Sequence, residues 1–258
     1  MVGRVLVRGS INIDEFFNVP QSVPPPILQL KQSKADLSSL RSIVNSGETI
    51  SSTGYSRRAG GKGANQAVSA SKAGGHVDLY GFLGNDGEWL LDELKGYGVG
   101  LAQTHIDLNL PTGRALIQLS TATLDNSIIL LPGANHSTLP LPFPSSTPTL
   151  PYTHLLLQNE IPFQSTLDYL SAAKKAGITT IWNPSPMPSK EALNSFPFND
   201  LDWLVVNEGE STELIRALYP GYDLDAKNDD ETILRRLSLT RRVGAVDKAD
   251  KSRDTGDG

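Results

Sequence analysis

A glycine-rich turn with one lysine is the segment best suited to bind a ligand: Gly60-Gly61-Lys62-Gly63-Ala64-Asn65. Glycines let backbone N–H groups approach a ligand closely, and a helix that follows directs its positive end at that ligand. The turn is not a P-loop, because Gly63 stands where a P-loop needs Ser or Thr to hold Mg²⁺. On this motif alone, an anion-binding turn and an ordinary strand-to-helix turn both stay open.

Polar side chains also follow three apolar runs that predict strands. They are Asn12 and Asp14 after 5–7, Glu160 after 154–157, and Asn207 and Glu210 after 203–206. Ligands of parallel α/β sheets bind outside the carboxyl ends of the strands. These side chains are therefore candidates for one site, while a turn or surface role for each carboxylate stays open.

The elements that would position these residues alternate along the chain. Apolar runs predict strands at 3–9, 77–83, 154–157, 178–182 and 203–206, and helical spacing predicts helices at 64–73, 86–95, 163–176, 188–194 and 209–218. Such alternation predicts right-handed βαβ units and an α/β fold with a mainly parallel sheet. Further strands are expected at 12–19, and as a pair at 114–119 and 127–131.

The composition excludes several classes of protein. The 258 residues are 38% hydrophobic and 20% charged, which is typical of a folded chain. The net charge of −5 argues against a general nucleic-acid binder. The absence of cysteine excludes disulfides, thiolate metal sites and a cysteine nucleophile. Because no apolar run could cross a membrane and no signal peptide is evident, we expect a cytoplasmic protein, with the nucleus as a second compartment.

The glycine pattern extends beyond the turn. Gly60-Gly61-x-Gly63-x-Asn65-x-Ala67 is followed by Gly74 after six residues and by Gly84 after nine more. This fixed spacing resembles the first signature of the phosphofructokinase-B-like carbohydrate kinases and, within that family, the ribokinase branch. Further segments match in the expected order: Gly9–Asp14, Gly47–Thr49, Gly84–Gly87, Pro111–Gly113, Pro132–Asn135, Gln158–Pro162, Asn183–Pro186 and Val205–Glu210.

The resemblance implies a ribokinase-like three-layer sandwich, in which a mainly parallel central sheet carries a small β-sheet lid. It also implies a carbohydrate kinase that transfers the γ-phosphoryl group of ATP to the 5-hydroxyl of D-ribose, with Mg²⁺ and K⁺ as cofactors. The sugar-binding residues so implied are Asn12, Ile13, Asp14, Gly61, Lys62, Gly63, Ala64, Asn65 and Glu160. Asn207 would lie near the ATP phosphates, and Glu210 would place Mg²⁺ through water. For Asn183, a purely structural role in a rigid turn stays open.

The family's lid implies further features. Its strands are expected at about 14–20, 49–58 and 113–119, within a domain at 1–234 that carries an insertion at 21–46 and a short helix near 37–44. Closing such a lid excludes water from the substrate. Lid sheets of two chains interlock in this family, which implies a homodimer.

The resemblance ends near 235–237. The family's second signature supplies the anion hole and the aspartate that takes the proton from the sugar, and residues around it bind K⁺. The only similar segment here is Asp254–Gly258, and the K⁺ site is missing as well. No catalytic residue is therefore assigned. Segment 235–258 has seven basic and four acidic residues and few aliphatic ones, which predicts a disordered tail. We expect that the C-terminal part of the fold is missing and that this chain alone is inactive.

Three hypotheses remain open. The chain is an incomplete ATP-dependent ribose kinase, a non-catalytic fragment that binds ribose or dimerises with an intact kinase, or another sugar or nucleoside kinase of the same family. Asn12, Asp14 and Glu160 with the glycine-rich turn favour ribose over adenosine or fructose phosphate.

Overall fold

The structure is a computed structural model of the whole chain, and it describes residues 3–19, 49–120, 126–144 and 152–221. Several sequence predictions lie outside the described residues: the insertion at 21–46 with its helix near 37–44, most of the proline-rich linker at 140–151, and the tail at 235–258.

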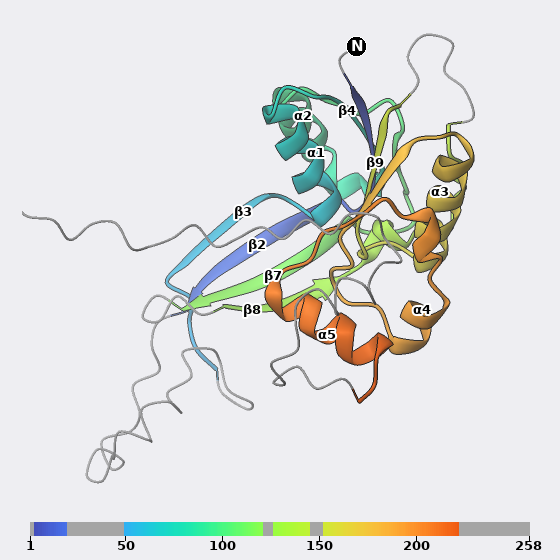
Figure 1. Cartoon of the computed structure of the whole chain (residues 1–258). Helices are drawn as coiled ribbons and strands as arrows, with labels where there is room; N and C mark the ends of the chain where they lie inside the picture. Colours follow the sequence, from blue (N-terminus) through green and yellow to red (C-terminus); the bar gives the residue numbers. More distant parts are fainter. Residues whose placement is uncertain (1–2, 20–48, 121–125, 145–151, 222–258) are drawn as a thin grey trace, which may run out of the picture.

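A parallel sheet forms the centre of the fold (Figure 1). Its order is β11-β10-β9-β1-β4-β5, with β6 also paired to β4. The strands are β1 (Arg4–Arg8), β4 (His76–Leu83), β5 (Val99–Gly100), β6 (Thr104–Ile106), β9 (His154–Leu157), β10 (Thr179–Trp182) and β11 (Trp203–Leu204). Every pair in it is parallel. The predicted α/β class with a mainly parallel sheet is confirmed.

Helices cover both faces of this sheet. They are α1 (Lys62–Lys72), α2 (Trp89–Gly96), α3 (Phe163–Lys175), α4 (Lys190–Ser195) and α5 (Glu208–Leu218), with 3₁₀ turns η3 (Asn85–Gly87), η4 (Gly133–His136) and η5 (Phe198–Asp200). One apolar cluster joins α1 and α2 to Val7 of β1, and a second joins α3, α4 and α5 to Leu6. Neighbouring strand residues point to opposite faces, so the three-layer sandwich is confirmed.

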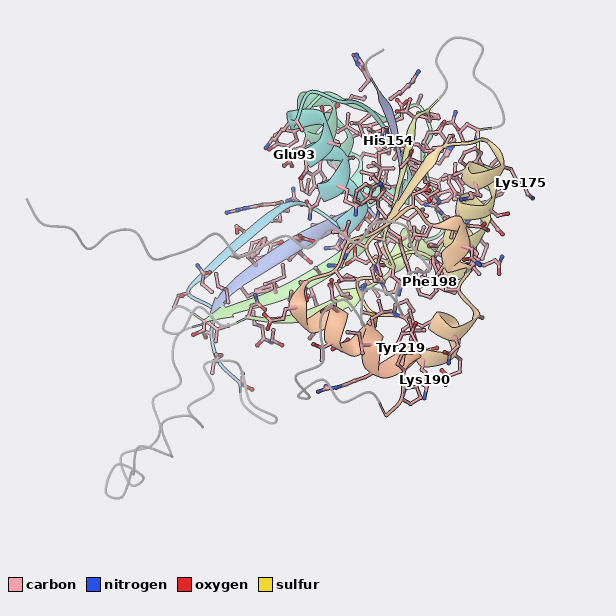
Figure 2. The ribbon with its side chains drawn as sticks, viewed as in Figure 1. Glu93, His154, Lys175, Lys190, Phe198 and Tyr219 are labelled. Carbon is pink, nitrogen blue, oxygen red and sulfur yellow. The ribbon has the colours of Figure 1, made fainter. Side chains whose placement is uncertain are left out.

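Side chains fill the space on both sides of the sheet (Figure 2). Phe198 is buried in the second cluster, where Trp182 and Phe196 stack with ring centroids 4.0 Å apart. Lys175 and Lys190 lie exposed on the outer ends of their helices. No helix among the described residues is long and apolar enough to span a bilayer.

A second, smaller sheet extends from one end of the sandwich (Figure 1). Its order is β3-β2-β7-β8, formed by β3 (Gly54–Gly60), β2 (Asn12–Val19), β7 (Gly113–Ser120) and β8 (Asn126–Leu131). The central pair β2–β7 is parallel and the outer pairs are antiparallel. The predicted pairing of 114–119 with 127–131 is confirmed, and β8 is a strand of this sheet that the predicted lid at 14–20, 49–58 and 113–119 omitted.

Two strand boundaries differ from the sequence predictions. β3 begins at Gly54 rather than near 49, and β11 ends at Leu204 rather than at 206. Residues 55–58, Tyr-Ser-Arg-Arg, are exposed and lack alternation, so their strand conformation depends on antiparallel pairing with β2, which is distant in sequence. The chain leaves β11 early because Asn207 begins the cap of α5.

Candidate functional site

Three segments that are far apart in the sequence meet at Glu160, beyond the carboxyl ends of β1 and β9. The Ser10 hydroxyl donates to Glu160 Oε2 at 2.7 Å, and the backbone N–H of Lys62 donates to the same oxygen at 2.9 Å. Gly63 N–H donates to the Ser10 hydroxyl at 3.2 Å. Ser10 is fully buried. This network holds the Glu160 carboxylate in one place and leaves Oε1 about 4.0 Å from Lys62 Nζ.

The glycine-rich turn brings the start of α1 against the β1–β2 connection. Gly61 has a φ of 89°, in the region that favours glycine, and a Cβ there would lie 2.8 Å from Asn12 N. A Cβ on Gly63 would collide with the backbone of Gly9 and Ser10. The anion at the positive end of α1 is therefore the protein's own Glu160.

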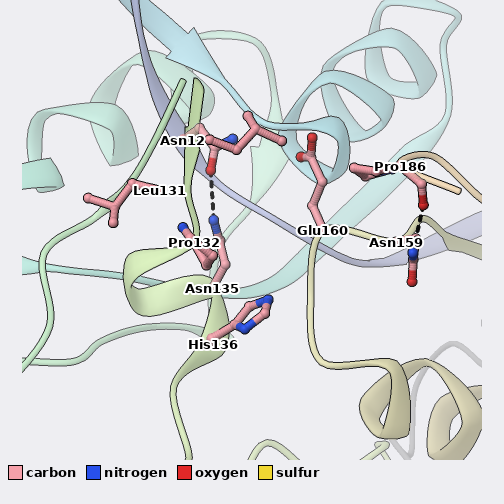
Figure 3. Close-up of a pocket in the computed structure, with 9 residues that line it drawn as sticks. Asn12, Leu131, Pro132, Asn135, His136, Asn159, Glu160 and Pro186 are labelled. Carbon is pink, nitrogen blue, oxygen red and sulfur yellow. Dashed lines mark hydrogen bonds between the residues drawn. The ribbon is translucent and has the colours of Figure 1, made fainter. Parts of the chain in front are cut away.

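A small cavity of about 130 Å³ lies between β2, the end of β8 and the segment after β9 (Figure 3). Asn12, Asn135 and His136 lie on one side, and Glu160, Asn159 and Pro186 lie on the other. Asn135 Nδ2 donates to Asn12 Oδ1 at 2.6 Å, and Ile11 N–H donates to Asn135 Oδ1 at 2.8 Å. Polar groups thus line both walls of a space that would suit a small polar molecule.

Asp14 follows Asn12 by two residues and so lies on the same face of β2. Its carboxyl group lies against Gly60, where any Cβ would overlap it. Oδ1 is buried and has no hydrogen-bond partner among the described residues. Burial, followed by the nearby charge of Glu160, raises the pKa of Asp14 to about 6, although Lys62 opposes the shift. A buried carboxylate oxygen without a partner points to a ligand that donates hydrogen bonds.

The other residues predicted for the sugar have different surroundings. Ile13 and Ala64 are buried in the apolar cluster with α1. Ala64 N–H donates to Ser10 O at 2.9 Å, so this residue joins α1 to the β1–β2 connection. Asn65 lies in the first turn of α1 with its side chain exposed. The structure therefore brings together Asn12, Asp14, Lys62 and Glu160, and it gives Ile13 and Ala64 packing roles.

A larger cavity of about 550 Å³ lies at the carboxyl ends of β10 and β11. Its lining includes Lys62, Gln66, Asn183, Ser185, Asn207 and Glu210. Lys62 faces this cavity and also lies beside Glu160, which lines the smaller one. One ammonium group is therefore placed between two neighbouring cavities, where it can interact with a charged group that spans them.

Asn207 and Glu210 form a capping box at the start of α5. Asn207 Oδ1 accepts from Glu210 N at 2.8 Å, and Asn207 N donates to Glu210 Oε2 at 3.0 Å. Asn183 Nδ2 donates to Val205 O at 2.8 Å and to Glu210 Oε2 at 3.3 Å. Each of the three residues therefore has a structural role. Glu210 Oε1 keeps no partner among the described residues.

This donor set fits magnesium and a nucleotide. The described residues contain no cluster of three or more His, Cys, Asp or Glu that could hold a metal. Mg²⁺ with a nucleotide needs only one or two carboxylates, because phosphates and water supply its other ligands. Glu210 Oε1 can hold a metal-bound water, and the N-terminus of α5 suits phosphate oxygens.

The residues that join the small sheet to the sandwich were not predicted from the sequence. Asp86 Oδ1 accepts from the backbone N–H of Thr112 at 2.8 Å and from its hydroxyl at 2.7 Å. Arg114 donates to Asp86 at 2.6 Å and to Glu15 at 3.0 Å. Burial opposes the ionisation of Asp86, but these hydrogen bonds outweigh it and lower its pKa. Segments 84–87 and 111–113 matched the family's motifs and could have indicated these residues, but no role had been assigned to them.

The comparisons with known proteins agree with the motifs. The family described as pfkB family carbohydrate kinase matches residues 33–238. The crystal structure of a ribokinase from Cryptococcus neoformans in complex with ADP is 43% identical, with a TM-score of 0.70 over 93% of this chain and 67% of that chain. The Arabidopsis thaliana ribokinase complexed with ribose and ATP is 28% identical, with a TM-score of 0.66 over 94% of this chain and 70% of that chain.

A curated ribokinase from Lactococcus lactis is 32% identical over 180 residues, which are 68% of this chain and 58% of that protein. The chain thus spans little more than half of this relative. The family match covers most of the chain, the fold is shared with ribokinase structures, and the signature residues lie at one edge of the sheet. The chain therefore belongs to the pfkB family of carbohydrate kinases.

Proposed function

We propose that this chain binds D-ribose in the cavity lined by Asn12 and Glu160, with Asp14 near Glu160, as the sugar-binding part of an ATP-dependent kinase that phosphorylates the 5-hydroxyl. The observation that carries the proposal is the buried Asp14 carboxylate, whose Oδ1 has no partner among the described residues and which lies near a second carboxylate. Two carboxylates accept hydrogen bonds only, so their complement is a molecule rich in hydroxyl groups.

Each side chain then has a separate task. The carboxylates of Asp14 and Glu160 accept charge-assisted hydrogen bonds from sugar hydroxyls. Asn12 contributes an amide, and Ser10 with Lys62 N–H keeps Glu160 oriented before the sugar arrives. Lys62 lies beside both cavities, so its charge favours a phosphoryl group positioned between them.

The larger cavity is proposed to hold ATP, with Asn207 near the phosphates and Glu210 holding a water bound to Mg²⁺. When bound, Mg²⁺ neutralises negative charge on the phosphates. The proton acceptor of the family and its K⁺ site have no counterpart among the described residues, and we assign neither. The cytoplasmic compartment, which is expected from the sequence, stays a prediction.

The small sheet is proposed to act as a lid and to contact a second copy of the chain. The aliphatic side chains of β8, Ile128, Ile129, Leu130 and Leu131, are between 44% and 58% exposed. Successive residues of a strand face opposite sides, so apolar area is open on both faces of this edge strand. Covering it in a dimer would remove an exposed apolar patch and an open strand edge.

Calorimetric titration of the 258-residue chain with D-ribose tests the proposal. We expect saturable binding that Asp14→Ala weakens and that Asp92→Ala, at an exposed position of α2, leaves unchanged. Adenosine is the second ligand, because binding of adenosine in preference to ribose would favour the nucleoside-kinase alternative. No binding of either ligand by folded protein would contradict the sugar site.

A further inference from the structure

We infer that Asn135 is a positioning residue that determines which end of the Asn12 amide faces the sugar. The inference rests on the proposed function and adds a residue that contributes to the specificity of the site for sugar hydroxyls. Asn135 lies in η4, after β8, and is only 2% exposed. It touches Asn12 and the backbone of Ile11 and was not among the residues predicted to bind the sugar.

The orientation of Asn135 follows from a backbone group. Ile11 is fully buried, and its N–H donates to Asn135 Oδ1 at 2.8 Å. A buried backbone N–H needs an acceptor, and the amide nitrogen of Asn135 cannot serve as one. Asn135 must therefore keep its oxygen toward Ile11, which leaves its Nδ2 to donate to Asn12.

The same reasoning then orients Asn12. Asn135 Nδ2 donates to Asn12 Oδ1 at 2.6 Å, the contact drawn as a dashed line in Figure 3. If the Asn12 amide were reversed, two NH₂ groups would face each other without an acceptor. Asn12 thus keeps its Nδ2 away from Asn135, and this nitrogen has no protein acceptor in the part of the chain that the structure describes. The cavity receives a donor from Asn12 rather than an acceptor.

A donor at this point complements the two carboxylates. A sugar hydroxyl that donates its one hydrogen bond to Asp14 or Glu160 has only its lone pairs left and can then only accept. Asn12 Nδ2 can donate to such an oxygen, whereas a reversed amide would place its carbonyl oxygen against it. The relay from Ile11 N–H through Asn135 to Asn12 therefore selects for hydroxyls that are already bound to a carboxylate.

Gly113 gives a second means to perturb this relay. A Cβ on Gly113 would overlap both Asn135 Nδ2 and Asn12 Oδ1, so only glycine lets the two amides meet. Gly113→Ala should separate the two amides without changing either. Asn135→Asp should keep the acceptor for Ile11 and remove the donor, which forces Asn12 to reverse.

The experiment combines NMR of the side-chain amides in ¹⁵N-labelled full-length protein with calorimetry using D-ribose. In the parent protein we expect slow hydrogen exchange at the Asn135 side-chain amide, faster exchange at Asn12, and a shift of the Asn12 signal when ribose is added. Asn135→Asp should protect the Asn12 amide and weaken ribose binding about tenfold, equivalent to about 1.4 kcal/mol. Gly113→Ala should weaken ribose binding as well.

Asn194→Asp, an exposed substitution in α4, is the control for the change of side chain and should alter neither readout. Unchanged ribose affinity in folded Asn135→Asp, or a parent in which Asn12 rather than Asn135 is protected, would overturn the relay. If the parent shows the predicted amide protection but no sugar moves any signal, the relay is supported and the proposed function fails. The two failures can therefore be told apart.

Discussion

Replacing Asp14 with Asn should stabilise the free protein near neutral pH and at the same time remove most of its affinity for ribose. The folded state raises the pKa of Asp14 from its ordinary 3.8 to about 6, chiefly through burial and then through the charge of Glu160. A folded-state pKa above the unfolded value means that the native protein retains this proton to higher pH. Stability attributable to Asp14 therefore falls as the pH rises from about 4 to about 6, and the cost is complete at pH 7.

The size of the effect follows from the shift. About two pKa units correspond to about 3 kcal/mol at 1.36 kcal/mol per unit. The carboxylate is partly solvated, and screening reduces this figure to about 1–2 kcal/mol. Asn cannot ionise and has nearly the same shape, so Asp14→Asn should recover that energy. The ligand loses a charged acceptor, which costs about 1.5–3 kcal/mol of binding.

The assay is urea unfolding of parent and Asp14→Asn protein at pH 7 and at pH 4, together with ribose calorimetry at pH 7. We expect the variant to be more stable by about 1–2 kcal/mol at pH 7, with the difference lost at pH 4, and ribose to bind about ten- to a hundredfold more weakly. A variant that is less stable than the parent at pH 7 would refute the conclusion that the ionised Asp14 carboxylate destabilises the free folded protein. Unchanged ribose affinity would refute its role in the site.

Three further predictions concern other parts of the molecule. Asn207→Ala should lower the unfolding free energy by about 1 kcal/mol through loss of the α5 cap, whereas Asn207→Asp should retain the cap, and equal stability of the two variants in urea would contradict this. Arg114→Met should break the contacts of β7 with Asp86 and Glu15. Amide hydrogen exchange should then become faster in β7 and change little in the central sheet. Uniform exchange rates across both sheets would contradict a role of Arg114 in joining them. The 258-residue chain alone should show no ribose-dependent turnover in a coupled assay with Mg-ATP and K⁺, and turnover near 1 s⁻¹ would reject that expectation.

The sequence predicted the central sheet well because its pattern is local. The apolar runs at Val5–Val7 and Leu155–Leu157, with the helices between them, specify parallel strands through apolar spacing alone. The small sheet was harder to predict, because residues 55–58 show no alternation of apolar and polar side chains and become a strand only by pairing with β2. Strand β8 has aliphatic side chains exposed on both faces, so a pattern of one buried and one exposed face could not identify it as a lid strand.

The candidate site was predictable only in part for the same reason. Asn12, Asp14 and Glu160 are visible because each follows a strand within a recognisable motif. Asn135 and Ser10 also lie in matched segments, but their roles were not predicted. Both orient other groups of the protein, and their partners lie 124 and 150 residues away in the sequence. Ile13 and Ala64 were predicted to bind sugar because they share the motifs. Both side chains lie in the apolar cluster with α1, and contact with the sugar stays a prediction for both residues.

The most direct test of the sugar site is the dissociation constant of D-ribose measured by calorimetry between pH 5 and pH 8. Ribose is proposed to bind the ionised form of Asp14, whose pKa in the free protein is about 6. The affinity should be constant above about pH 7 and should fall below pH 6, approaching tenfold per pH unit, with protons released on binding. An affinity for ribose that does not change with pH across this range would contradict the central claim, as would the absence of binding by folded protein.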